Sequence, residues 1–83
     1  MRAVLDTNVA LAGLLWRGPS YALLGFALTG KLQCFATDAL IAELERVLGY
    51  THVARRIAAL NTSITQILTD YRALIEMIPD ATI

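Results

Sequence analysis

Two short apolar segments with helical patterns between them constrain the fold most strongly. Residues 2–5 end directly before Asp6, and residues 31–36 include Cys34 and Phe35. Both segments have the length and composition of short strands. Because parallel strands need a long, usually helical, crossover connection, the two strands are predicted to pair in parallel. The sequence therefore predicts an α/β fold in which helices flank a small parallel sheet.

Helical patterns cover most of the remaining chain. Arg17-Gly18-Pro19 separates a first helix from a second, and Pro19 suits the first turn of the second. Thr37 or Asp38 is a suitable N-cap for the third helix, and Gly30 and Gly49 are suitable C-terminal stops. The helices are predicted at 8–15, 20–29, 38–48, a short stretch from Thr51, and from Thr62 or Ser63 to about residue 75; the tail 76–83 is predicted to begin as a strand.

The chain is short and apolar. Of its 83 residues, 57% are hydrophobic and 17% are charged, which argues against disorder. Cys34 is the single cysteine, so no internal disulfide can stabilise the fold. A core in so short a chain supplies little stability by itself. We therefore expect apolar surface to be buried against a second copy, a partner protein or a further part of the domain.

The charge and hydropathy of the sequence argue against several classes of function. The formal net charge of zero argues against a protein that coats nucleic acid through bulk positive charge, although an enzyme that contacts nucleic acid at one site is compatible with it. The apolar runs 9–16 and 21–28 are each shorter than the roughly 20 residues of a membrane-spanning helix. Asp6 and Asn8 interrupt the apolar pattern that a secretory signal needs. We expect a cytoplasmic protein without a membrane segment.

Asp6 is the first candidate functional residue. It closes the first predicted strand and precedes a helix, and ligands of open α/β sheets bind beyond the carboxyl ends of the strands. Thr7 and Asn8 are placed to cap the helix and to hydrogen-bond Asp6. The alternative, about equally favoured on spacing alone, is that these three residues form only a capping turn.

Glu43 is the second candidate. Leu40, Leu44 and Val47 share one stripe of the third predicted helix, and Glu43 lies at the border of that stripe. A carboxylate at such a border can face a cleft beside the sheet. The alternative is a solvated carboxylate paired with a base such as Arg46, and the pattern alone favours that alternative.

Together these features resemble the PIN-domain family, in particular the bacterial PIN-type toxin ribonucleases of toxin–antitoxin modules. The resemblance covers nearly the whole chain, and the two acids at this spacing make it fairly specific. The matching stretches are Val4-Leu5-Asp6-Thr7-Asn8, Leu14-Leu15-Trp16-Arg17-Gly18-Pro19, Asp38-Ala39-Leu40-Ile41-Ala42-Glu43-Leu44, Arg46-Val47-Leu48 and Ala54-Arg55-Arg56.

The resemblance implies a three-layer fold, in which helices sandwich a parallel sheet, and cleavage of RNA phosphodiester bonds. It implies that Asp6 and Glu43 are catalytic and bind Mg²⁺ or Mn²⁺, and that Thr7 and Asn8 orient Asp6. Carboxylate oxygens are the ligands that such hard cations require. It further implies a toxin component whose partners are RNA, a cognate antitoxin and a second copy in a homodimer.

The family's remaining acids lie in a later segment, which this sequence does not include. Asp70 and Asp80 do not match the family's pattern. We therefore expect residues 1–83 to form a PIN-like domain that lacks its C-terminal part and has little or no catalytic activity alone. One alternative is a truncated, non-catalytic module that binds an antitoxin or a second copy. Another is a generic α/β module whose acids only cap helices.

The remaining polar and aromatic residues give weaker signals. One histidine, His52, and one cysteine cannot form a zinc site, and no Gly-rich phosphate loop is present. Trp16 and Tyr21 flank the Arg17-Gly18-Pro19 turn, where they suit base stacking or a partner surface, although packing is the favoured interpretation. The four arginines Arg17, Arg46, Arg55 and Arg56 suit phosphate contacts, although solvation or ion pairing is favoured in a neutral chain.

Overall fold

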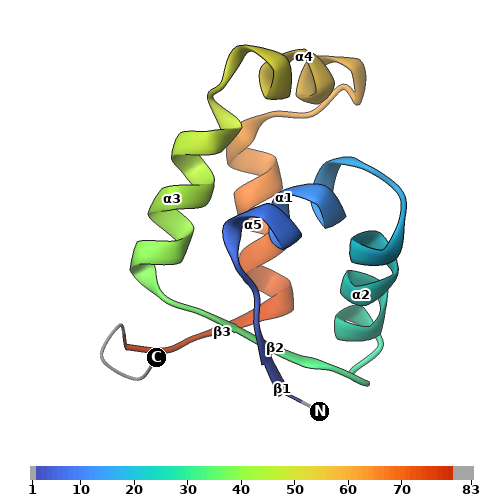
Figure 1. The fold of residues 1–83 in the computed structure, drawn as a ribbon, viewed down its shortest axis with the longest axis vertical. Helices are drawn as coiled ribbons and strands as arrows, with labels where there is room; N and C mark the ends of the chain where they lie inside the picture. The colour runs from blue at the N-terminus through green and yellow to red at the C-terminus, as the bar shows by residue number, and fades with distance from the viewer. Residues whose placement is uncertain (1, 80–83) are drawn as a thin grey trace.

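The structure is a computed structural model that describes residues 2–79. Within these residues the chain forms three strands, with two helices between the first and second strands and three between the second and third (Figure 1). In order they are β1 (Arg2–Val4), α1 (Thr7–Leu15), α2 (Pro19–Leu28), β2 (Gln33–Ala36), α3 (Asp38–Leu48), α4 (Thr51–Ala59), α5 (Ile64–Leu74) and β3 (Ile75–Met77). The strands lie at the bottom of the view in Figure 1, and α4 lies at the top, farthest from them.

The strands form one parallel sheet in the order β1-β2-β3. Val4 pairs with Phe35 at the end of β1, and Phe35 pairs in turn with Glu76 of β3. All three carboxyl ends therefore lie at the same edge of the sheet. The α/β class, the parallel pairing and a third strand near residue 76 were predicted from the sequence, and the structure confirms them. Residues 80–83 of the predicted tail lie outside the described part.

Local chemistry explains where the helices begin and end. The side chain of Thr37 accepts a hydrogen bond from the Leu40 N–H, so Thr37, and not Asp38, caps α3. Ser63 caps α5 in the same way through Gln66 N–H. The short helix predicted from Thr51 is α4, and the sequence suggested Thr51 as its cap because threonine is a good N-cap residue. That suggestion was wrong, because Tyr50 occupies the N-cap of α4 without a side-chain bond. Thr51 is instead the first helical residue.

The core joins the inner faces of all these elements. Its buried side chains are Leu5, Ala10, Leu15, Leu24, Leu32, Cys34, Ala36, Ile41, Leu44, Leu48, Val53, Ile57, Ile67, Leu68 and Tyr71. Burial raises the pKa of the Cys34 thiol, and it raises the pKa of Tyr71 to about 12, with the nearby Cys34 adding to the second effect. Within residues 2–79, no helix is both long and apolar enough to cross a membrane.

The contact between α1 and α2 is unusually close at Gly13. A β-carbon at this position would lie 2.7 Å from Leu24 Cδ1 and 2.8 Å from the Ser20 carbonyl oxygen. Real side chains do not tolerate such distances, so the packing of α2 on α1 depends on the missing side chain. Gly30, just after α2, has a φ of 80° and ends the helix in the left-handed conformation that glycine adopts easily.

Candidate metal and catalytic site

The carboxyl edge of the sheet brings the starts of two helices together. Because Val4 and Phe35 are paired, Asp6 and Thr37 each lie two residues beyond a paired strand position. Asp6 is the N-cap of α1, Thr37 is the N-cap of α3, and these two helices pack against each other. This edge is where parallel α/β sheets place their ligand sites.

Asp6 is exposed and held by the helix that it caps. Its Oδ1 accepts a hydrogen bond from the Val9 N–H at 2.8 Å, and the positive end of the helix dipole favours its charge. Among the described residues, nothing hydrogen-bonds to its other oxygen, Oδ2. Asp6 therefore presents one oriented carboxylate with an oxygen open to a ligand.

Thr7 and Asn8 do not cap α1, and their supporting role toward Asp6 stays a prediction. They are the first two residues of α1, and within the described part of the chain neither side chain hydrogen-bonds to Asp6. The backbone N–H of Val9 orients the carboxylate instead. The expectation that Thr7 or Asn8 caps the helix was wrong, because an N-cap carboxylate reaches the N–H three residues further on.

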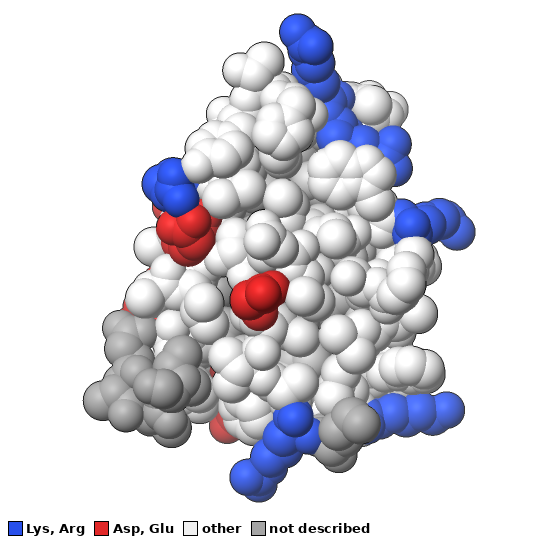
Figure 2. Space-filling model, viewed as in Figure 1, with Lys and Arg blue, Asp and Glu red and all other residues white. Residues whose placement is uncertain are grey.

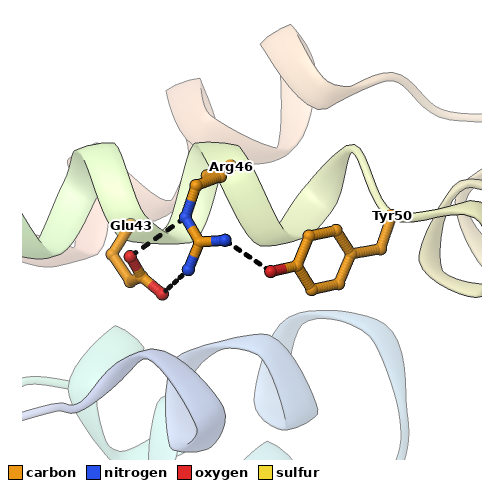
Figure 3. A network of polar contacts seen from close by, with 3 residues as sticks. All are labelled: Glu43, Arg46 and Tyr50. Carbon is orange, nitrogen blue, oxygen red and sulfur yellow. Dashed lines mark hydrogen bonds and ion pairs between the residues drawn. The ribbon is translucent and has the colours of Figure 1, made fainter.

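Glu43 lies half-buried on α3 in an ion pair with Arg46 (Figure 3). Arg46 Nε donates to Oε2 at 3.2 Å, and Nη2 donates to Oε1. Arg46 Nη1 also donates to the Tyr50 hydroxyl, and the guanidinium lies over the Tyr50 ring. The hydrogen bonds and the charge of Glu43 raise the pKa of Arg46.

The pairing of Glu43 with Arg46 is the arrangement that the alternative interpretation expected. The side chains of Glu43 and Arg46 are 43% and 57% exposed, so water and salt screen the pair, and it adds little to the stability of the fold. A carboxylate held this weakly can exchange its arginine partner for a stronger ligand.

The donor chemistry of the two acids fits a hard divalent cation. Mg²⁺ is typically bound through one or two carboxylates, with water and substrate phosphates as further ligands. Among residues 2–79 there is no group of three or more His, Cys, Asp or Glu side chains that could hold a metal ion. Asp70 accepts a hydrogen bond from Gln66 on the exposed side of α5, and Asp80 lies outside the described residues.

Two features of this region were not singled out as functional in the sequence. Thr37 is completely buried at the sheet edge beside Asp6, although the sequence identified it only as one of two possible caps. The contact between Arg46 and Tyr50 links the last turn of α3 to the N-cap of α4. Because the chain leaves the helix between these two residues, helical spacing gave no signal for it.

Comparison with known proteins identifies the family. The family model described as PIN domain matches residues 2–82. The match spans nearly the entire chain, and the protein belongs to the PIN-domain family. This membership supports a function of the nuclease type, and PIN domains generally depend on divalent metal ions. No curated protein and no solved structure matches the chain significantly.

Proposed function

We propose that this protein is a PIN-type ribonuclease that depends on a divalent metal ion and acts as the toxin component of a toxin–antitoxin system. Because residues 2–79 contain no group of three or more possible metal ligands, we expect this chain alone to cleave RNA phosphodiester bonds weakly or not at all. The observation that carries the proposal is the exposed Asp6 carboxylate at the carboxyl edge of the parallel sheet, in a chain that matches the PIN-domain model. The cytoplasm is the proposed location, since the single cysteine, Cys34, is free and buried.

Asp6 and Glu43 are the residues that would hold Mg²⁺ or Mn²⁺. When bound, such a cation lowers the pKa of a coordinated water and neutralises charge at the reacting phosphate. The Val9 N–H keeps Asp6 in one rotamer, which lowers the entropy lost when the carboxylate binds. Glu43 contributes only after it releases Arg46, and the freed guanidinium is then available to bind phosphate. Thr7 and Asn8 would support Asp6 through the first turn of α1.

The decisive experiment combines RNA cleavage with divalent-cation binding. Purified protein is incubated with RNA and Mg²⁺, with an EDTA control, beside the variants Asp6→Asn and Glu43→Gln. Asparagine is as good an N-cap as aspartate, so Asp6→Asn should keep the wild-type melting temperature while it abolishes cleavage and weakens Mg²⁺ binding. Asp70→Asn, which changes an acid on the exposed side of α5, is the matched control and should cleave like the wild type.

Cleavage that persists in EDTA and in Asp6→Asn would remove the metal-nuclease proposal. The remaining interpretation would then be the generic α/β module, in which Asp6 only caps α1.

A second candidate function is a non-catalytic interaction module, and one surface favours it. Three large apolar side chains of α2 are exposed: Tyr21 at 48%, Phe26 at 51% and Leu28 at 74%. A cognate antitoxin or a second copy of the chain is the proposed occupant of this surface. Thermal melts over a range of protein concentrations test the second copy, because the midpoint of a dimer rises with concentration. Added antitoxin would raise the midpoint at a fixed protein concentration.

A further inference from the structure

A cluster of arginine and aromatic side chains lies at the end of α1 opposite Asp6. Arg56 lies over the Trp16 ring with 5.7 Å from Cζ to the centroid, and Arg17 lies over the Tyr21 ring at 5.3 Å. The two pairs lie at the same end of α1, so two guanidinium groups and two aromatic rings are close together there.

The cluster surrounds two shallow hollows. One, of about 160 Å³, is lined by Leu14, Leu15, Trp16, Arg17, Tyr21, Arg56 and Leu60. The other, of about 110 Å³, shares Trp16, Arg17 and Tyr21 with the first. Both are smaller than the roughly 300–1,000 Å³ of small-molecule pockets, so they suit a single planar ring and not a whole cofactor.

The surface is held in place by backbone contacts. Arg56 Nε donates a hydrogen bond to the Leu15 carbonyl at 2.8 Å, which ties α4 to the last turn of α1 and fixes the guanidinium over Trp16. Trp16 is the C-cap of α1 and is 40% exposed, while Tyr21 is 48% exposed. Both rings are therefore partly exposed, although a guanidinium lies over one face of each.

The charge around the cluster has one sign. The sequence has no Asp or Glu at 7–37 or at 46–69, whereas Arg17, Arg55 and Arg56 lie in these stretches. Within the described residues, none of these three arginines forms an ion pair. Basic side chains gather at the upper right in Figure 2, over α4 and the connection between α1 and α2, and the acidic side chains on this face lie elsewhere. The surface is thus positive as well as aromatic.

We propose that Trp16, Arg17, Tyr21 and Arg56 form a binding subsite for single-stranded RNA, in which an unpaired base stacks on the aromatic rings and the arginines contact its phosphates. Aromatic platforms flanked by positive charge are the chemistry that binds single strands without reading sequence. The choice of RNA rests on the proposed function. Unneutralised guanidinium groups favour a polyanion over an apolar protein surface.

The subsite would position RNA and leave the chemistry to Asp6. Asp6 and Trp16 cap opposite ends of α1, ten residues apart, which corresponds to about 15 Å along a helix. A strand held at Trp16 would therefore place a phosphate a few nucleotides away at the sheet edge.

The test measures binding without cleavage. In EDTA, a short single-stranded oligoadenylate should quench the fluorescence of Trp16, which is the only tryptophan. By the anisotropy of a fluorescein-labelled oligoadenylate, Trp16→Leu should weaken binding about tenfold, whereas Trp16→Phe should retain most of it. Arg17→Ala should lower the slope of log affinity against log salt by about one. Arg56→Ala should weaken binding, whereas Arg72→Ala, which removes an exposed arginine of α5 outside the cluster, is the control and should bind like the wild type.

The outcomes separate this proposal from the proposed function. Asp6→Asn should bind the oligoadenylate like the wild type in EDTA, even if it no longer cleaves. Quenching supports the subsite whether or not the chain cleaves RNA, whereas Mg²⁺ binding that is unchanged in Asp6→Asn contradicts the proposed metal site. Equal affinity in Trp16→Leu and the wild type overturns the subsite, whether or not Asp6 is needed for cleavage. A Trp16 emission shift caused by protein concentration alone also overturns it, because a second copy then covers the surface.

Discussion

Helices α1 and α2 contain no charged residue, whereas α3, α4 and α5 carry both an apolar and a charged face. In α3, Ile41, Leu44 and Leu48 are buried, while Asp38 is exposed. In α2, only Leu24 is buried, although most of the helix is apolar. The two groups of helices therefore differ in whether the sequence itself distinguishes the side that faces solvent.

The difference shows how each helix acquires its orientation. An amphipathic helix turns its apolar stripe inward because burial of that stripe removes apolar surface from water. An apolar helix has no such preference, and α2 is oriented by its contact with Gly13 of α1 and by the turn that ends at Pro19. The consequence is apolar surface, at Phe26 and Leu28, that this single chain leaves in contact with solvent.

The largest expected change in the free energy of unfolding comes from leucine substitutions that compare an amphipathic helix, α3, with an apolar helix, α2. Leu48→Ala in α3 removes a completely buried side chain and should lower the free energy of unfolding by about 2–5 kcal/mol. Leu28→Ala in α2, where the leucine is 74% exposed, should change it by less than about 0.5 kcal/mol. Urea denaturation at low protein concentration measures both. Equal losses would mean that the apolar face of α2 is covered.

The next prediction concerns stability at alkaline pH and compares Tyr71 of α5 with Tyr21 of α2. Tyr71 of α5 is 2% exposed, and its pKa of about 12 exceeds the ordinary value of about 10 because burial disfavours the phenolate. The folded state therefore holds this proton more tightly than the unfolded state. Below pH ~10 both states keep the proton, and this group does not reduce the free energy of unfolding. Between pH ~10 and ~12 only the unfolded state loses the proton, so the free energy of unfolding falls by about 3 kcal/mol at most.

Alkaline unfolding of Tyr71→Phe measures this loss. The variant should lose less stability than the wild type between these pH values. Tyr21→Phe, which alters an exposed tyrosine of α2, should follow the wild type. If Tyr71→Phe follows the wild type as well, the explanation from burial is wrong.

Replacement of two glycines by alanine should change the free energy of unfolding in opposite directions. Gly13→Ala would place a β-carbon against the Ser20 carbonyl and Leu24, and the clash should outweigh the gain in helix propensity, for a net loss of about 1–2 kcal/mol. At Gly25, inside α2, nothing lies within 4 Å of the added carbon, so Gly25→Ala should stabilise by about 0.5–1 kcal/mol. Thermal melts compare them. A stabilising Gly13→Ala would show that α2 is not closely packed on α1.

The smallest effect on stability concerns the charged face of α3. Arg46→Ala removes an exposed, solvent-screened ion pair and should leave the free energy of unfolding nearly unchanged. It should also tighten Mg²⁺ binding, because Glu43 no longer has to release a cation. Calorimetric titration with Mg²⁺ checks this, with Arg72→Ala on α5 as the control. Unchanged Mg²⁺ affinity would remove Glu43 from the proposed metal site.

Local patterns were enough to predict most of the elements. The helical periodicity of apolar residues predicted α3 and α5, and the Arg17-Gly18-Pro19 turn predicted the division between α1 and α2. The parallel pairing of the strands followed from the helical connections between them. The predictions failed at single caps, such as Thr51, because several neighbouring residues had suitable chemistry. The position of Asp6 at the carboxyl edge of the sheet could be predicted because the end of a parallel strand is a defined position. The salt bridge of Glu43 was foreseen only as one of two alternatives, since a border position on a helix fits both.

The sequence by itself determined the α/β class, the parallel sheet and the edge at which Asp6 lies, because strand length, helix period and capping chemistry act over a few neighbouring residues. Only the tertiary structure decided which face of α2 stays exposed and that Arg56 of α4 lies over Trp16 at the end of α1. These contacts join residues far apart in the chain. They depend on the packing distance between the helices, and no pattern of neighbouring residues predicts that distance.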